Sequence, residues 1–433
     1  MVPCNKYAIL FLQAAVMVAV LCAVPSHGKI DGQISSSLNL AGSFDTVFAF
    51  GDSDTDNGNC RLIGGFRNFV GGWLNTLKGA MALQSGGGFG GSVGGAVSAP
   101  GGSAAGGSDG GSKQVTVSGN GLINGKLIIE HLCDALGIPS IQPYQNHAAN
   151  FSSGANFAVA GSTTLPGSFF LHNNLLSLMW KTVPETFDTQ LQWFNNFIQN
   201  FKNKGAGGKG GKPNMDNTLF WLGGVGKSDF ARIHRVSASS EWLTQQAIDH
   251  ITKFIQGIVS QGAKYIVVQG LPPVGCLPLD LATSSVTERD QNGCAARINN
   301  AVMRHNELLQ QTIGSLQKSF PKCVFVYADI WKAYMQVLSG YHQYGFTEPF
   351  KACCGIRDGS QYNFNLKDLC GTLGTTVCSE ANKHMVWDGI HFTAAMHTVI
   401  FKLFTEGGCT HPTFEQLLKI KSAAQKVDQS VGA

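Results

Sequence analysis

Charged residues are scarce in this chain: Asp, Glu, Lys and Arg together make up 13% of its 433 residues. That is about half the share found in an ordinary soluble domain. The formal net charge of +4 is small, and the basic residues are scattered along the chain. Charge of this size and distribution does not predict binding to a nucleic acid.

Long apolar runs are also scarce, and the one at residues 7–24 is the only run that approaches the length of a membrane span. It follows a single basic residue, Lys6, and precedes a stretch with small residues, which is the layout of a secretory signal peptide. We therefore predict that residues 1–28 are a cleaved signal peptide and that the protein is secreted, to the extracellular space or the cell wall, with no stable membrane span. An uncleaved membrane anchor is the alternative. The sequon at Asn150 predicts a glycosylation site, which fits secretion.

Secretion decides how the cysteines are interpreted. Ten of the twelve lie outside the predicted signal peptide, and an oxidising compartment favours disulfides. Short separations make Cys276 and Cys294 plausible partners, and the same holds for members of the group Cys353, Cys354, Cys370 and Cys378. A zinc site is the competing interpretation. It is weak because these cysteines lack the regular spacing of zinc ligands, so no metal is predicted.

Short β-branched or aromatic runs alternate along the chain with longer segments of helical periodicity. This alternation predicts an α/β fold with a parallel sheet. Four apolar runs are predicted to be strands buried on both faces: Thr46–Phe50, Thr218–Leu222, Tyr265–Gln269 and Val324–Tyr327. Apolar residues at helical spacing predict helices over 241–261 and 295–319.

Two glycine-rich stretches interrupt this alternation, at residues 85–112 and 202–212. Their composition predicts flexible surface loops. A phosphate-binding glycine loop is an alternative for residues 85–112. It is disfavoured because no Gly-Lys-Ser/Thr sequence follows and no predicted strand leads into the segment.

The first candidate for chemistry is Ser53, which lies just past the predicted strand Thr46–Phe50 in the sequence Gly51-Asp52-Ser53. The carboxyl ends of parallel strands are where α/β proteins bind their ligands. A serine hydroxyl becomes a strong nucleophile only with a base beside it and a third group that orients the base. Taken alone, Gly-Asp-Ser is more typical of a simple turn than of a catalytic site, because all three residues favour turns.

The second candidate is the pair Asp388 and His391, far along the chain. In a tight loop, a carboxylate three residues before an imidazole can bond one ring nitrogen and fix the tautomer. The other nitrogen is then free to take a proton from Ser53. By itself Asp-x-x-His is a common spacing, and the pair gains weight from its surroundings.

These surroundings resemble the plant-type GDSL esterase/lipases, a branch of the SGNH hydrolases. The resemblance covers nearly the whole mature chain and rests on ordered motif matches. They are Phe48 to Ser53 with Asp56, Gly58 and Asn59, then Gly154 to Thr163, Gly270 to Pro278, His305-Asn306, Ala352 to Gly355, Tyr362 to Asn365, and Trp387 to Thr393.

The resemblance implies a single domain over residues 29–433 with a three-layer α/β/α sandwich and a flavodoxin-like parallel sheet. It also implies hydrolysis of an ester substrate through an acyl-enzyme, with no metal or organic cofactor. In this family pattern Ser53 is the nucleophile, His391 the base and Asp388 its orienting acid. The N–H groups of Ser53 and Gly161 would stabilise the oxyanion.

Two departures from the family pattern concern the active site. The block Gly-x-Asn-Asp appears as Gly226-Lys-Ser228-Asp229, so Ser228 replaces the asparagine of the oxyanion hole. A hydroxyl reaches less far than an amide, and losing one such donor costs about 10²–10³ in kcat. A second motif, at residues 119–126, lacks the arginines of the family, which bears on substrate preference.

Three functions are compatible with these residues. The first is a secreted serine hydrolase that cleaves carboxylic esters of lipids or small acyl groups. The second is an O-acetyl esterase acting on polysaccharide, and the third is a catalytically impaired binding protein that keeps the fold, because of Ser228. A glycosidase with Asp52 and Asp54 as its paired carboxylates is disfavoured, since residues on either side of Ser53 point in different directions.

Overall fold

The structure of the protein is a computed structural model. It describes residues 38–63, 124–172, 185–204, 213–233, 240–356, 359–366, 368–371 and 374–431, which all belong to one compact unit. The predicted signal peptide 1–28 and the predicted loop 85–112 lie outside the described residues. So does most of the predicted loop 202–212, whose first three residues instead form the end of a helix.

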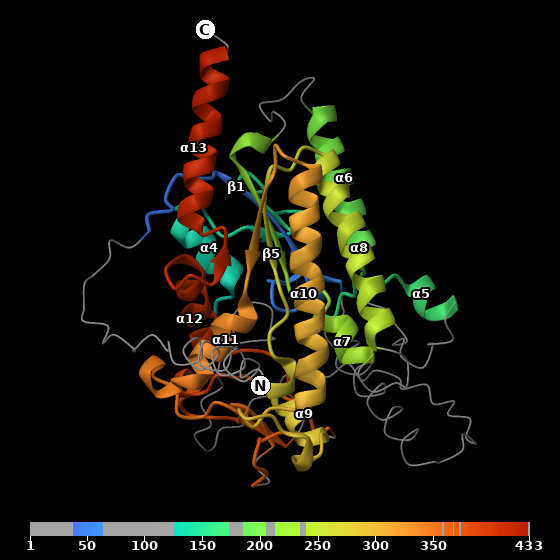
Figure 1. The fold of residues 1–433 in the computed structure, drawn as a ribbon, viewed down its shortest axis with the longest axis vertical. Helices are drawn as coiled ribbons and strands as arrows, with labels where there is room; N and C mark the ends of the chain where they lie inside the picture. The colour runs from blue at the N-terminus through green and yellow to red at the C-terminus, as the bar shows by residue number, and fades with distance from the viewer. Residues whose placement is uncertain are drawn as a thin grey trace, which may run out of the picture. The chain divides into compact units, whose positions relative to one another are not determined.

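A mostly parallel sheet forms the centre of the fold (Figure 1), and in the described part of the chain it has seven strands in the order β2-β3-β1-β4-β5-β6-β9. The strands are β1 (Thr46–Gly51), β2 (Gln142–Pro143), β3 (Gly154–Asn156), β4 (Thr218–Gly223), β5 (Tyr265–Gln269), β6 (Val324–Ala328) and β9 (Thr410–His411). Only β9, at the edge beside β6, runs antiparallel to its neighbour. The four predicted strands are β1, β4, β5 and β6, so the predicted parallel sheet is confirmed.

The order of the main strands fixes where a ligand can bind. Without the two-residue edge strands, the order β3-β1-β4-β5-β6 is the flavodoxin-like order, in which the second strand along the chain lies outside the first. In such sheets the loops after the first and third strands, here β1 and β4, diverge at the switch point where ligands bind. Ser53 follows β1 and Ser228 follows β4.

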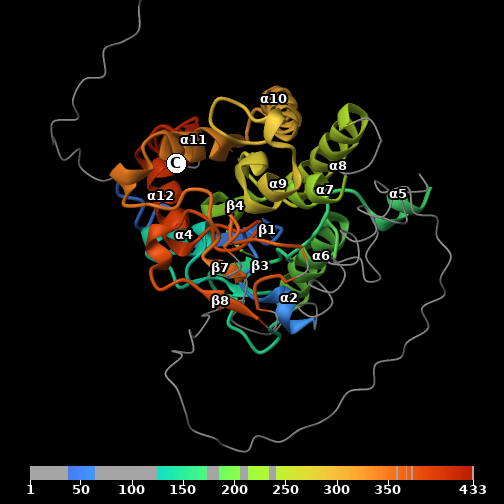
Figure 2. The same cartoon turned by 90° about the horizontal axis from the view of Figure 1, so that it is seen from below.

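Helices cover both faces of the sheet. They are α2 (Asn59–Leu62), α4 (Ile128–Leu136), α5 (Gly167–His172), α6 (Phe187–Lys204), α7 (Lys227–Ile233), α8 (Ser240–Ser260), α9 (Pro278–Thr283), α10 (Ala296–Ser319), α11 (Ile330–Ser339), α12 (Ala394–Thr405) and α13 (Phe414–Val431). Helices α4, α11, α12 and α13 lie on one side of the sheet in Figure 1, and α6, α8 and α10 on the other. The same two layers are seen end-on in Figure 2. None of the helices described in the structure is long and apolar enough to cross a bilayer.

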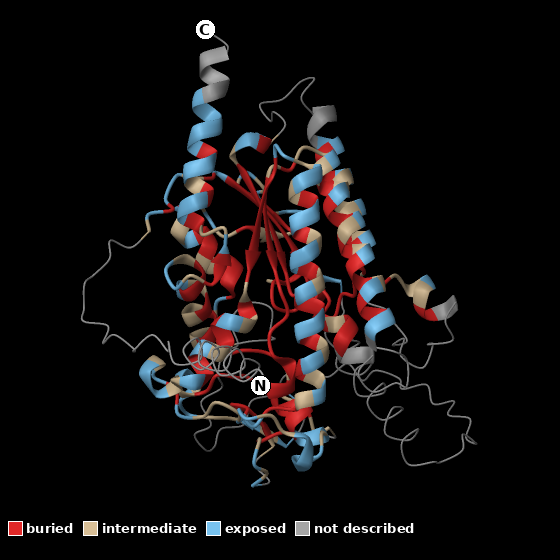
Figure 3. Ribbon diagram, viewed as in Figure 1, coloured by how far each residue is buried: buried red, intermediate tan, exposed pale blue. Residues whose placement is uncertain are grey.

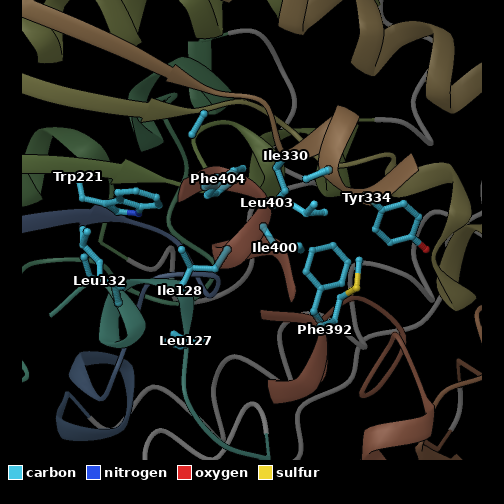
Figure 4. Packing of buried hydrophobic residues seen from close by; sticks show 14 of the residues in the cluster. Leu127, Ile128, Leu132, Trp221, Ile330, Tyr334, Phe392, Ile400, Leu403 and Phe404 are labelled. Atoms are coloured by element: carbon cyan, nitrogen blue, oxygen red, sulfur yellow. The ribbon is translucent and has the colours of Figure 1, made fainter. Parts of the chain in front are cut away.

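Strand β4 shows why each central strand is a continuous apolar run in the sequence. Leu219 and Trp221 pack with the helices of one layer, whereas Phe220 and Leu222 pack with those of the other. Because successive side chains of a strand point to opposite faces, a sheet covered on both sides needs apolar residues at every position. Figure 3 shows the resulting buried centre, and Figure 4 shows Trp221 beside residues of α4 and α12. The predicted three-layer sandwich is therefore confirmed.

The disulfides confirm one predicted pair and resolve a second group. Cys276 is bonded to Cys294, as predicted. Cys353 is bonded to Cys378 and Cys354 to Cys370, and both bonds cross-link the hairpin of β7 (Cys354–Ile356) and β8 (Thr375–Val377). The other four cysteines outside the predicted signal peptide are buried free thiols: Cys60, Cys133, Cys323 and Cys409.

The remaining short elements are five 3₁₀ turns within the described ranges. They are η2 (Met215–Asn217), η3 (Val274–Cys276), η4 (Val286–Glu288), η5 (Tyr341–Tyr344) and η6 (Ala381–Lys383). The η3 turn and α9 follow the carboxyl end of β5, and α9 lies at the bottom of Figure 1. This edge of the sheet carries the candidate site.

Candidate active site

Ser53 lies in a tight turn at the carboxyl end of β1. Gly51 reaches the turn with φ at +146°, and a Cβ on it would lie 1.9 Å from the carbonyl oxygen of Gly223 in β4. Only glycine fits there. The turn closes through a hydrogen bond from the Asp56 N–H to the Asp52 carbonyl oxygen (2.9 Å). The predicted nucleophile Ser53 is thereby fixed at the sheet edge with 4% of its surface exposed.

Asp388 and His391 are brought together by the loop that precedes α12. Asp388 Oδ2 lies 2.8 Å from His391 Nδ1. The other carboxylate oxygen accepts the backbone N–H groups of Ile390 (2.7 Å) and His391 (2.8 Å). Burial alone would raise the pKa of Asp388, but the imidazole and these N–H groups hold it below its ordinary value. An ionised Asp388 that accepts from Nδ1 leaves Nε2 of the neutral ring unprotonated, as a base requires.

His391 Nε2 is the ring nitrogen that Asp388 does not bond. The atom is buried and has no hydrogen-bond partner among the described residues. In the described structure no hydrogen bond joins it to Ser53 Oγ either. Both side chains are buried, and a bond from the Leu279 N–H in α9 to the Gly389 carbonyl oxygen (3.1 Å) holds the His391 loop at the carboxyl edge of the sheet. Such bonds are often long in unliganded sites and shorten only when substrate is bound.

The hydroxyl group of Ser228 donates its proton to the carboxylate of Asp52. Its Oγ lies 3.0 Å from Asp52 Oδ2, while Asp52 Oδ1 accepts the N–H of Asp54 (3.1 Å). Gly224 makes room for this carboxylate, because a Cβ there would lie 2.0 Å from Asp52 Oδ1. Burial, and then the charge of Asp54, raise the pKa of Asp52 to about 8. Above that pH Asp52 is ionised and accepts the one hydroxyl proton of Ser228, which then has no second proton to offer to an oxyanion.

Gly161 lies in a turn that follows β3. The turn closes through a hydrogen bond from the Ser162 N–H to the Val159 carbonyl oxygen (3.0 Å), and Gly161 takes φ at +79°. Val159 also donates its N–H to the Gly51 carbonyl oxygen (3.1 Å), which ties this turn to the end of β1. The Gln190 side chain bonds the Gly51 N–H, the Gly51 carbonyl and Ser162 Oγ. The Gly161 turn and the Ser53 turn are therefore held side by side.

Other residues of the family motifs hold the surrounding loops in place. Asp229 accepts the N–H groups of Thr164 (2.8 Å) and Leu165 (3.0 Å), so α7 anchors the segment after Gly161. Asn124, from the altered motif at residues 119–126, caps the helix after His391 by accepting the Ala394 N–H (2.9 Å). The rest of that motif, residues 119–123, lies outside the described structure. These roles are structural.

A buried ion pair lies beside these residues, and the motif comparison assigned no role to it. Lys227 Nζ and Asp54 Oδ1 are 2.5 Å apart, and their side chains are 7% and 2% exposed. Burial alone would raise the pKa of Asp54, but the charge of Lys227 lowers it below its ordinary value. Burial alone would lower the pKa of Lys227, but Asp54 and Asp52 raise it. A lysine directly after the apolar Gly-rich run 223–226 was the available signal in so weakly charged a chain.

The described side chains offer no obvious metal centre at this edge. Among the residues that the structure describes, no group of three or more His, Cys, Asp or Glu is arranged to hold a metal ion. The chemistry that the residues present can support is proton transfer and nucleophilic attack, from Ser53 and from the Asp388–His391 pair.

Several known proteins are similar to this chain, and they agree with the family resemblance found in the sequence. Residues 47–404 match the family described as GDSL-like Lipase/Acylhydrolase. GDSL esterase/lipase At3g48460 of Arabidopsis thaliana is 34% identical over 388 residues, covering 88% of this chain and 90% of the relative. Acetylajmalan esterase 2 of Rauvolfia serpentina is 32% identical over 280 residues, covering 63% and 74%. GDSL esterase/lipase At5g45910 of Arabidopsis thaliana is 31% identical, covering 67% and 80%.

Proposed function

Since the chain belongs to the GDSL-like lipase/acylhydrolase family of carboxylic ester hydrolases, we propose that Ser53, His391 and Asp388 are its catalytic triad. The observation that carries this proposal is the bond of 2.8 Å between His391 Nδ1 and Asp388 Oδ2. It leaves Nε2 as a buried base with no partner in the described chain, at the edge of the sheet where β1 ends just before Ser53.

The proposed reaction proceeds through an acyl-enzyme. His391 Nε2 takes the hydroxyl proton of Ser53 as Oγ attacks the acyl carbon, and the proton then passes to the leaving alcohol. Water repeats the attack with the same base and frees the acid. Asp388, kept ionised by the contacts that lower its pKa, stabilises the imidazolium that forms in both steps.

The oxyanion hole of the proposed site has two backbone donors, the N–H groups of Ser53 and Gly161. The bonds that tie the Gly161 turn to Gly51 support this placement. Ser228, at the position of the missing asparagine, does not donate directly to the oxyanion, because its proton is donated to Asp52. We expect a working but weakened hole, since each lost donor costs about 10²–10³ in kcat.

The proposed substrate is a carboxylic ester of a lipid or of a small acyl group, cleaved outside the cell or in the cell wall. The name of one relative, acetylajmalan esterase 2, favours a short acyl group on a small molecule as the first class to test. Secretion is supported by the three disulfides. Asn150 is exposed at the surface, as the proposed glycosylation would require.

The test is hydrolysis of p-nitrophenyl esters of increasing chain length by the protein purified from a secretory host, with Ser53→Ala as the control. We expect activity that falls to background in the Ser53→Ala variant. Acetylated polysaccharide is assayed in parallel, because preference for it would favour the O-acetyl esterase alternative. Activity that persists without Ser53 would refute the proposed triad.

A second candidate function is supported by the Ser228–Asp52 bond. A site that has lost one oxyanion donor is also what a binding protein derived from an esterase would contain. This candidate predicts no turnover of any ester by a folded, disulfide-bonded sample. Ester analogues should then still bind, and binding should be insensitive to Ser53→Ala.

A further inference from the structure

The loop that carries Asp388 and His391 closes on itself. The Trp387 N–H donates to the His391 carbonyl oxygen (2.7 Å), and Asp388 Oδ1 accepts two N–H groups of the same loop. These bonds fix Asp388 against His391. They do not fix the loop against Ser53, which lies on a different segment of the chain. The approach of His391 Nε2 to Ser53 Oγ therefore depends on what holds the loop from outside.

The start of this loop is bonded to the hairpin of β7 and β8. The Cys354 N–H donates to the Trp387 carbonyl oxygen (2.6 Å), and the Cys353 N–H donates to the Val386 carbonyl oxygen (3.2 Å). Both donors also belong to the two disulfides that cross-link the hairpin. These hairpin disulfides are Cys353–Cys378 and Cys354–Cys370. The backbone that carries them is thus bonded directly to the residue before Asp388.

Further contacts hold the tip of the loop. Gly389 lies so close to Phe364 that a Cβ on Gly389 would lie 2.2 Å from the phenylalanine ring. The segment of Phe364 is itself bonded beside the hairpin, because Asn363 Nδ2 donates to the Ala352 carbonyl oxygen (2.8 Å). From α9, the Leu279 N–H donates to the Gly389 carbonyl oxygen (3.1 Å). The loop is therefore held by α9 and by segments bonded to the hairpin.

The hairpin depends on its disulfides for its own structure. Strands β7 and β8 are three residues each, and a two-stranded hairpin is only marginally stable by itself in water. In the described chain its hydrophobic cluster has three buried members, Cys353, Cys354 and Trp387, and it is separate from the two large clusters that pack on the sheet. The hairpin disulfides and Trp387 are therefore the core of this small unit.

We propose that the disulfide-bonded hairpin of β7 and β8 positions His391 for its reaction with Ser53, so that ester hydrolysis requires the hairpin disulfides to be oxidised. This inference rests on the proposed function. The four cysteines of the hairpin disulfides are positioning residues, because they act through the loop and do not touch the ester. Reduction of these bonds releases the loop and leaves the sheet and its helices folded.

The hairpin disulfides are also the ones that a reductant reaches first. Cys370 and Cys378 are half-buried, whereas Cys276 and Cys294 are both 0% exposed. A thiolate of a dithiol reductant attacks the half-buried sulfur, the S–S bond breaks, and the buried cysteine leaves as a thiolate and takes up a proton. The second thiol of the reductant then frees the other cysteine as a thiol and closes the reductant to a cyclic disulfide.

The first test is the steady-state kinetics of a variant without the hairpin disulfides. It combines Cys353→Ser, Cys354→Ser, Cys370→Ser and Cys378→Ser. Misplacing a reacting group by about 1 Å can cost about 10²-fold in rate. We therefore expect kcat to fall about 10- to 100-fold with KM unchanged, because the substrate still binds while the base no longer meets Ser53.

A matched control separates the position of the loop from the stability of the fold. Ile258→Ala removes a fully buried side chain of α8, in the cluster on one face of the sheet, and leaves the disulfides intact. The cavity lowers the stability of the protein. At a temperature where both variants are folded, Ile258→Ala should keep the kcat of the wild type. An equal loss of kcat in this control overturns the proposal.

The second test needs no variant to fold. The folded wild type is treated with dithiothreitol, and the reduced cysteines are identified by alkylation and mass spectrometry. We expect kcat to fall in step with reduction of the hairpin disulfides, with an unchanged far-UV circular dichroism spectrum, and to return on reoxidation. A kcat that is unchanged when both hairpin disulfides are reduced overturns the proposal.

Amide hydrogen exchange keeps this result separate from the proposed function, because it needs no turnover. In a Ser53→Ala background, peptides that cover residues 386–393 should exchange faster once the hairpin disulfides are reduced. Peptides from β5 should exchange as before. This outcome supports the inference that the hairpin holds the loop even if the wild type hydrolyses no ester. Unchanged exchange over residues 386–393 overturns it.

Discussion

Replacing Ser228 by asparagine should increase the activity of this protein. In the structure the single hydroxyl proton of Ser228 is donated to Asp52 Oδ2, 3.0 Å away, so the oxyanion receives no direct bond from this position. An asparagine amide has two N–H donors. One can keep the bond to Asp52 while the other reaches the oxyanion. Ser228 is only half-buried, which leaves space for the longer side chain.

The expected gain is set by the value of one oxyanion donor. A full donor contributes about 10²–10³ in kcat, or roughly 3–4 kcal/mol. Since the amide would share its donors with Asp52, we expect a smaller gain than a full donor gives, about 10- to 100-fold in kcat with little change in KM. The assay is steady-state hydrolysis of p-nitrophenyl acetate and butyrate at a pH above about 8, where Asp52 is ionised. Ser228→Ala is the matched control and should cost less than about fivefold, because its hydroxyl makes no bond to the oxyanion.

Two results would refute this reasoning. One is a Ser228→Asn variant that is folded but no faster than the wild type, which would mean that the hole is already complete. The other is a Ser228→Ala variant that loses about 10² or more in kcat, because the serine hydroxyl would then be a direct oxyanion donor. In that case Asp52 would be protonated and would donate to Ser228, as its raised pKa allows.

Three further changes test the site and its frame. Asp388→Asn should lower kcat by about 10⁴ through the wrong imidazole tautomer. The fold lowers the pKa of Asp388, so its carboxylate stabilises the folded state above the unfolded pKa, and this stabilisation is lost as pH falls through the folded pKa. Urea midpoints measured from pH 6 to 2 should therefore fall less steeply in the Asp388→Asn variant than in the wild type. Replacing Cys276 and Cys294 together by serine should lower the free energy of unfolding by about 3 kcal/mol, measured by urea titration, since their bond closes a loop of 18 residues. Gly51→Ala should cost at least about 2 kcal/mol in thermal melts, because its Cβ would lie 1.9 Å from a backbone carbonyl oxygen, whereas Gly42→Ala, with no neighbour within 4 Å, should cost less.

Much of the frame could be predicted from local patterns. Strands β1, β4, β5 and β6 lie where their apolar runs predicted them, because a strand covered on both faces needs apolar residues at every position. The Cys276–Cys294 bond could also be predicted from a local pattern, since a short separation in sequence restricts the possible partners. By contrast, the two-residue strands β2 and β9 carry no pattern of their own. Each forms only because it pairs with a neighbouring strand of the sheet.

The sequence also predicted the Asp388–His391 contact, because a spacing of three residues lets a tight loop close the bond without help from the rest of the fold. It could not predict the partner of Ser228. That partner, Asp52, lies 176 residues away and reaches Ser228 only because β1 and β4 pair in parallel with Gly51 beside Gly223. The role of Ser228 thus depends on a register between strands, which no local pattern contains.

The sequence by itself determined the family, the layered fold and the identity of the three proposed catalytic side chains, since each depends on periodicity or on motifs with fixed spacing. Only the tertiary structure decided the electrostatics of the site. Asp54 and Lys227 are 173 positions apart, and nothing in the sequence states that they are buried against one another at 2.5 Å. Burial removes water from both charges, and the strength of a charge interaction depends on that removal. Which charges are buried against one another is therefore a property of the packed fold.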